Sequence, residues 1–316
     1  MAETTHWSKT EERGSLVGMR FLIGVYRLLG RYILWIFLFP VVTYFFLTGK
    51  AANQALSEYF NNLHATYPDA PNNSLWNRYK LFLIYANSIF DRFDAWLGKI
   101  DPAGIDYNDE SIFPQIVESG QGAIFIGSHL GNLEVCRALG QNFSSVINVL
   151  VFTQHAEKFN QVLSEINPDV KTNLYQLANI TPDLAMILKD KLESGEFVVI
   201  VADRTSTTNP GKSFDEEFLG QMARFPQGPF ILACLLDSPV YWIYCFKRGG
   251  RYRVIFEFVA DTLYEQRKQR LDSLQKVVKQ YVNRLEFYTR SYPFQWFNFH
   301  RFWQPIKSND RNTGDN

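Results

Sequence analysis

One segment in the middle of the chain, residues 123–137 (AIFIGSHLGNLEVCR), joins a strand signal to a turn and a helix start. Its first four residues are apolar, as in a short strand buried within a sheet. Gly127 and Gly131 bracket a tight turn, and Asn132 opens a helix predicted over 133–139 that ends at Gly140. His129 is therefore expected at the carboxyl edge of a sheet, where ligands bind in open α/β folds.

His129 and Glu134 are the candidate catalytic residues of this segment. A neutral imidazole can take a proton from a hydroxyl through one ring nitrogen, while a carboxylate holds the other nitrogen and stabilises the imidazolium. Glu134 is the expected partner if the turn folds the imidazole back over the helix start, whose free backbone N–H groups could stabilise an oxyanion. The alternative is a loop histidine and a glutamate that offsets the helix dipole.

The sequence Gly-Ser-His-Leu-Gly-Asn-Leu-Glu at 127–134 resembles the His-x4-Glu motif of the bacterial lipid A late acyltransferases. These are lauroyl and myristoyl transferases of the lysophospholipid acyltransferase superfamily. The glycerol-phosphate branch usually has Asp at the second position, so Glu134 favours the lipid A-like branch. The resemblance extends from the hydrophobic N-terminus to Arg301.

This resemblance implies an α/β fold, with a mixed central sheet flanked by helices. It also implies an O-acyltransferase that moves a fatty acyl chain from a thioester to a hydroxyl. The expected donor is acyl carrier protein or coenzyme A, and the expected acceptor is a lipid or glycolipid. Neither a cofactor nor a metal is suggested. A catalytically inactive lipid-binding or scaffold protein with the same fold is the alternative, and the lack of a Gly-x-Ser-x-Gly motif disfavours a soluble hydrolase.

Asp203 and Arg204 follow an apolar run, 197–202, that predicts another buried strand. They are expected at the same sheet edge as His129. The resemblance places an Asp after this strand near the active site, and an arginine can hold a phosphate or carboxylate through two hydrogen bonds. The residues after Asp203 depart from the family pattern, which leaves the acceptor open. A surface ion pair is the other interpretation.

The stretch 214–230 resembles a family segment in which a turn, here Phe218-Leu-Gly220, leads into a substrate loop. Arg224 is a candidate phosphate contact, and Gly228 at the start of a helix would let the backbone approach a ligand closely. The predicted substrate-binding set is Gly131, Asn132, Asp203, Arg204, Arg224 and Gly228.

Residues 1–50 are the predicted membrane-associating segment. The run 32–48 carries no charge but is shorter than the roughly 20 apolar residues of a comfortable span, and Pro40 predicts a kink. A spanning anchor, an interfacial helix and a buried core helix remain open. Arg20, Arg27 and Arg31 favour an interfacial helix that meets anionic headgroups, because a simple span would place the catalytic domain outside the cell. We expect the bacterial inner membrane, with the catalytic domain facing the cytoplasm.

The rest of the chain is expected to form one acyltransferase domain, 51–306, followed by a disordered tail, 307–316. A helix is predicted over 156–165 and a long amphipathic helix over 261–288. The formal net charge of zero gives no sign of nucleic acid binding, and the cysteines form no CxxC pair. The predicted strands are 123–126, 146–153, 197–202, 240–246 and 252–258, the last two as a hairpin.

Overall fold

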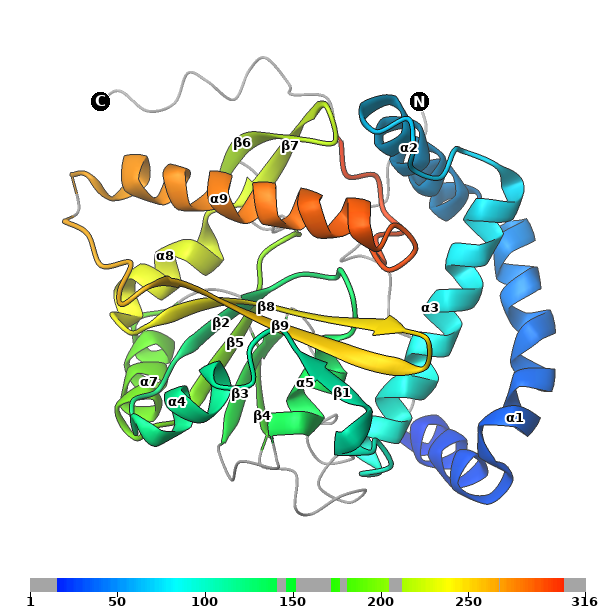
Figure 1. Cartoon of the computed structure of the whole chain (residues 1–316), viewed down its shortest axis with the longest axis horizontal. Coiled ribbons are helices and arrows are strands. Elements are labelled where there is room, and N and C mark those ends of the chain that lie inside the picture. The colour runs from blue at the N-terminus through cyan, green and yellow to red at the C-terminus, as the bar shows by residue number, and fades with distance from the viewer. Residues whose placement is uncertain are drawn as a thin grey trace.

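The computed structural model describes residues 16–140, 146–151, 172–176, 181–204, 212–266 and 268–303. Within them a seven-stranded sheet has the order β1-β9-β8-β2-β5-β3-β4, and a separate two-stranded sheet pairs β6 with β7. Helices cover both faces of the large sheet (Figure 1). Its strands pair in parallel except for the antiparallel hairpin β8–β9. The predicted mixed α/β fold is confirmed.

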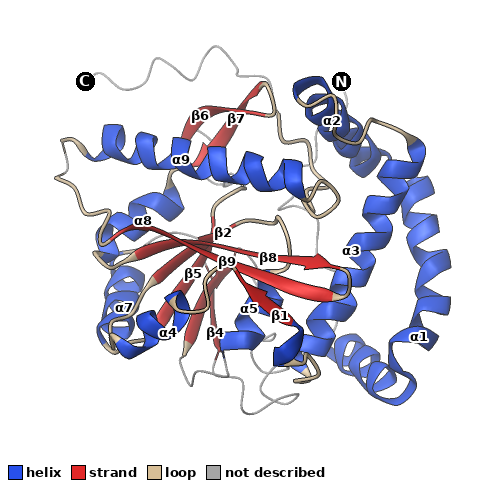
Figure 2. Cartoon of the chain, in the orientation of Figure 1, coloured by secondary structure: helices blue, strands red, loops and turns tan. Residues whose placement is uncertain are grey.

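Figure 2 shows the helices and strands in separate colours. The strands are β1 (Ile105–Tyr107), β2 (Ile124–Gly127), β3 (Ile147–Val151), β4 (Thr172–Gln176), β5 (Phe197–Val201), β6 (Ser213–Phe218), β7 (Gln221–Pro226), β8 (Val240–Arg248) and β9 (Arg251–Ala260). The helices are α1 (Leu16–Thr48), α2 (Lys50–Thr66), α3 (Leu75–Trp96), α4 (Ile112–Glu118), α5 (Leu133–Gly140), α7 (Pro182–Glu193), α8 (Gly228–Leu236) and α9 (Arg270–Ser291).

The central strands are apolar on both sides because both faces of the sheet are covered. Ile126 of β2 and Ile200 of β5 belong to a large core that also holds Tyr281 of α9. Phe125 and Phe197, from the same two strands, point to the other face and pack with α4 and α5. This pattern explains why the sequence shows continuous apolar runs rather than alternation.

Several elements were not predicted from the sequence. β1 and β4 are short edge strands, and β6 and β7 form a hairpin where a turn and a substrate loop were expected. Leu219 and Gly220 both have positive φ, 51° and 70°, which suits the tight turn of a two-residue hairpin. The helix expected over 261–288 begins only at Arg270. The predicted helix 156–165 and the tail 307–316 lie outside the described residues.

The N-terminal helices stand beside the sheet rather than over either face of it (Figure 1). α1 runs along α3, and α2 inserts Leu56, Tyr59 and Phe60 into the main core. The helical dihedrals of α1 break at Gly30, with φ 72° and ψ 177°. The break was expected at Pro40, which instead lies inside the helix. Glycine adopts a positive φ without steric cost, and so it takes the bend.

Candidate active site

His129 lies just beyond the carboxyl end of β2, two residues after Gly127. β2 pairs in parallel with β5, and in that register Gly127 is opposite Val201. Continuing the register places His129 beside Asp203, and the two residues make a double contact. The backbone N–H of His129 donates to Oδ2 of Asp203 at 2.9 Å, and its ring Nδ1 lies 2.7 Å from Oδ1. Sheet pairing thus builds a histidine–aspartate dyad.

Asp203 is held from a second side by the C-terminal segment. Its side chain is only 1% exposed, and Oδ2 also accepts a hydrogen bond from Nε1 of Trp296 at 3.2 Å. The same segment pairs with the turn that carries His129, because the N–H of Gly131 donates to Gln295 O at 2.8 Å and that of Phe297 to His129 O at 3.0 Å. Residues 295–297 therefore form the back wall of the dyad.

The charges of the dyad follow from its surroundings. Burial lowers the pKa of His129 below its ordinary value, although the Asp203 charge opposes the shift. Burial on its own would raise the pKa of Asp203, yet His129 and Arg204 together hold it below the usual value. A neutral imidazole therefore faces a carboxylate at neutral pH. Because a carboxylate only accepts hydrogen bonds, Nδ1 must carry the proton, which leaves Nε2 as the basic nitrogen.

The carboxylate that holds the imidazole is Asp203, whereas the sequence analysis gave that role to Glu134. Glu134 lies on the first turn of α5, and its Oε2 accepts a hydrogen bond from Nε1 of Trp96 at 3.1 Å. The parallel pairing of β2 with β5 brings Asp203 to Nδ1, so nearness in sequence was misleading. Glu134 still lines the same cavity as His129.

Gly131 and Asn132 shape the turn after His129. Gly131 has φ +83°, and a Cβ there would lie 2.2 Å from the carbonyl oxygen of Cys245, so the position requires glycine. The N–H of Asn132 donates to that same oxygen at 2.8 Å, and its side-chain amide donates to Ser88 O at 3.0 Å. The backbone N–H of Asn132, just before the helix start, is therefore used within the protein. Both residues line the cavity.

Three further predicted site residues separate into two groups. Arg204 lines the cavity and donates from Nη2 to Phe297 O at 3.3 Å. Arg224 is on β7, where its Nε lies 3.7 Å from Oδ1 of Asp215 on the opposite strand, and Gly228 is the first residue of α8. Neither Arg224 nor Gly228 lines the cavity, because the β6–β7 hairpin carries this stretch away from it. Their expected contact with substrate stays a prediction.

The cavity in front of His129 has a volume of about 440 Å³, within the range of small-molecule sites. Its walls change in character along β5, from Arg204 and Val201 at the carboxyl end through Val199 to Phe197 at the other end. The rings of Phe113, Phe125 and Phe197 gather at this far end, with centroids 5.4–6.3 Å apart. The cavity is thus polar beside the dyad and apolar farther from it, over the face of the sheet. No group of three potential metal ligands occurs in the described part of the chain.

Sequence reasoning missed three residues of this site: Tyr85 and Arg92 of α3, and Trp296. Trp296 ends the motif Pro-Phe-Gln-Trp at 293–296. A buried indole N–H needs an acceptor, which was a signal that Trp296 has a polar partner. The amphipathic pattern of α3 gave no indication that Arg92 turns toward the site.

One comparison with known proteins gives the family of this chain. The family model described as "Bacterial lipid A biosynthesis acyltransferase" matches residues 91–305, more than half of the chain. The matched range starts near the end of α3 and includes His129, Asp203 and Trp296. No curated protein matches the chain.

Proposed function

Because the chain belongs to the family of bacterial lipid A biosynthesis acyltransferases, we propose that it transfers a fatty acyl chain from a thioester to a lipid hydroxyl at the His129–Asp203 dyad. The observation that carries this proposal is the dyad's place at the polar end of an apolar cavity. The family is one of acyltransferases that use an acyl donor and a lipid acceptor. The residue roles that follow are our inference.

The dyad has the geometry for general base catalysis. In the proposed step, the oxygen of the acceptor hydroxyl attacks the thioester carbonyl while Nε2 of His129 takes the hydroxyl proton. Asp203 stabilises the imidazolium that forms. The carbon–sulfur bond then breaks, and the imidazolium returns the proton to the departing thiolate. The products are an ester and a free thiol, and no serine or cysteine nucleophile is required.

The apolar part of the cavity suits the acyl chain. Val149, Val199 and Ile243 come from three strands of one sheet face, and α4 and α5 cover them. Transfer of an alkyl chain from water to such a site contributes about 0.8 kcal/mol per buried methylene. We infer that the chain lies along this face while its thioester carbonyl remains at His129. The donor is acyl carrier protein or coenzyme A, and the acceptor is a lipid or glycolipid.

An assay with a labelled acyl donor tests this proposal. The purified full chain is mixed with acyl-acyl carrier protein or acyl-coenzyme A and with vesicles of bacterial lipid. We expect one acylated lipid to form for each thiol released. Saturable donor binding without release of thiol would instead support the inactive lipid-binding alternative. Lipid analysis of a deletion strain, which asks which lipid loses an acyl chain, would identify the acceptor.

The pH dependence should show a neutral histidine base. Since burial lowers the pKa of His129 from the ordinary 6.5, the imidazole stays neutral as the pH falls toward that value. We expect kcat/KM to remain level through neutral pH and to fall only below pH 6.5, as His129 gains a proton. An acid limb centred above pH 6.5 would contradict the proposed environment of this imidazole.

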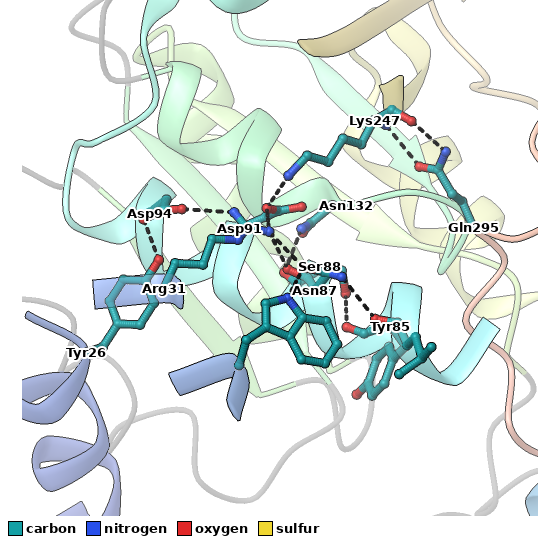
Figure 3. Close-up of polar contacts among 12 residues, drawn as sticks. Tyr26, Arg31, Tyr85, Asn87, Ser88, Asp91, Asp94, Asn132, Lys247 and Gln295 are labelled. Carbon is teal, nitrogen blue, oxygen red and sulfur yellow. Dashed lines mark hydrogen bonds and ion pairs between the residues drawn. The ribbon is translucent and has the colours of Figure 1, made fainter. Parts of the chain in front are cut away.

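We also propose that α1 attaches the protein to one leaflet of the bacterial inner membrane, with the site on the cytoplasmic side. The segment Gly24–Thr48 is, by length and composition, long and apolar enough to cross a membrane. One face of α1, however, makes polar contacts with α3 (Figure 3). Tyr26 donates to Asp94 at 2.6 Å, and Nη2 of Arg31 lies 2.8 Å from Oδ1 of Asp91. A spanning α1 would draw these carboxylates toward the hydrocarbon, which is costly.

The opposite face of α1 is the surface offered to lipid. It exposes a row of large apolar side chains: Leu28, Tyr32, Ile33, Ile36, Phe37, Tyr44, Phe45 and Leu47. Tyr32 is 87% and Ile36 71% exposed, which is unusual for such residues in a folded protein. Arg31 was expected to meet headgroups, but its guanidinium is held by Asp91 and Asp94. We infer that α1 lies along the interface on this apolar face.

Replacing Ile36 and Phe37 together with serine should weaken binding to lipid vesicles. Each buried side chain of this size contributes about 1.5–3 kcal/mol, so the two together contribute about 3–6 kcal/mol and we expect membrane affinity to fall by roughly a hundredfold or more. Vesicle co-sedimentation measures it. The matched control is Phe258→Ser, which removes another exposed phenyl ring, on β9. Equal losses in the two proteins, or none in either, would contradict the assignment of this face to lipid.

A further inference from the structure

Two arginines face the cavity beside the dyad. Arg92 comes from α3 and Arg204 follows β5, and both side chains line the same cavity as His129. Their charges act on each other and on the dyad, because Arg92 helps to lower the pKa of both Arg204 and His129. Elements far apart in the sequence therefore bring two guanidinium groups to the polar part of the cavity.

The carboxylates nearby are already occupied. Asp203 is buried behind His129 and accepts its hydrogen bonds from His129 and Trp296. Glu134 is the one carboxylate among the described residues that line the cavity, and it accepts a hydrogen bond from Trp96. The buried Nε of Arg92 has no hydrogen-bond partner within the described part of the chain. Like charges and a buried donor without an acceptor are both unfavourable unless an anion joins them.

We propose that Arg92 and Arg204 form a phosphate-binding site at the polar end of the cavity, and that Tyr85 adds a phenolic donor. Guanidinium groups bind phosphate through paired, charge-assisted hydrogen bonds. Tyr85 lines the cavity too, and its ring is fixed against Phe297 and Phe299 at centroid distances of 5.3 and 4.9 Å. This inference rests on the proposed acyl transfer and adds to it a phosphate on the substrate.

The phosphate has two chemical sources in such a reaction. One is the phosphopantetheine arm shared by acyl carrier protein and coenzyme A, and the other is a phosphate on the acceptor lipid. In either case the site holds the phosphate beside His129 while the acyl chain occupies the apolar part of the cavity. Binding energy from this remote group would then position the reacting atoms.

Matched ligands with and without phosphate test the site. Calorimetry on the His129→Asn protein, where no turnover interferes, compares 4′-phosphopantetheine with pantetheine, and vesicles of phosphatidic acid with vesicles of diacylglycerol. In at least one of the two pairs, we expect the ligand with phosphate to bind roughly tenfold more tightly, or better, than the ligand without it. A gain with phosphopantetheine indicates the donor, and a gain with phosphatidic acid indicates the acceptor. No gain in either pair overturns the proposal.

Substitutions then show which residues provide the extra affinity for the ligand with phosphate. Arg92→Gln and Arg204→Gln should each remove most of this extra affinity. Arg92→Lys should keep part of it, since lysine retains the charge but lacks the paired N–H donors of a guanidinium group. Lys279→Gln, which removes an exposed positive charge from α9, should change nothing. A gain that survives both glutamine substitutions overturns the site. Phosphate binding by a chain that transfers no acyl group would keep the site and refute the acyl transfer itself.

Discussion

Replacing Asp203 with asparagine is expected to lower kcat for acyl transfer by roughly 10⁴-fold, the size found when the aspartate of a catalytic triad is replaced in this way. The asparagine amide can donate to Nδ1, which would move the ring proton to Nε2 and remove the base from the cavity. The change keeps the shape of a side chain that is 1% exposed. Steady-state kinetics with a labelled thioester measure the loss, and the melting temperature reports on folding.

Glu134→Gln is the matched comparison because it replaces the other carboxylate by its amide. Trp96 can still donate to the glutamine carbonyl, and the contact between His129 and Asp203 is unchanged. We therefore expect a smaller loss than for Asp203→Asn. If Glu134→Gln abolished transfer while Asp203→Asn left it nearly intact, Glu134 would be the working partner of His129, and the arrangement seen here would not be the active one.

Replacing Val199 with tryptophan is expected to block the cavity partway along β5 and to make the enzyme select shorter acyl chains. Val199 faces the cavity between Val201 and Phe197. Residues two apart on a strand lie about 6.6 Å apart, so the indole would cut off the far part of the site. Long-chain donors should lose about a hundredfold or more in kcat/KM, if several methylenes at about 0.8 kcal/mol each are left outside.

A competition assay with donors of graded chain length measures this preference. Val199→Ile adds one methylene at the same position and should shift the preference only slightly. Phe113→Ala removes a ring from the far end and should extend the preference toward longer chains. An equal loss for donors of all lengths in the Val199→Trp protein would mean that the acyl chain lies elsewhere.

The sequence carried enough information to place His129 and Asp203 at one edge of a sheet. Buried parallel strands appear as short apolar runs, and the polar residues that follow them collect at the carboxyl edge. What it could not supply was the identity of neighbouring strands. The parallel pairing of β2 with β5, in the register Gly127 opposite Val201, decides that Nδ1 meets Asp203 rather than Glu134. That register depends on packing across the whole sheet.

Residues that reach the site from distant elements were the hardest to predict. Arg92 belongs to a helix whose pattern indicates only packing, and Trp296 meets the turn that carries His129 through an isolated β-bridge to Leu130. The position of Arg224, outside this cavity, was hard to predict for the opposite reason. Its segment reads as a loop, but the positive φ at Leu219 and Gly220 closes it into a hairpin. Local patterns do not record such contacts.

The most direct measurement compares single-turnover transfer by the natural protein and by His129→Asn. Both proteins are loaded with one equivalent of labelled acyl thioester on acceptor vesicles, and the labelled lipid is followed in time. We predict that the natural protein moves the label into an ester, while His129→Asn binds the thioester equally well and leaves it intact. Transfer at comparable rates by both proteins would show that the imidazole is not the base.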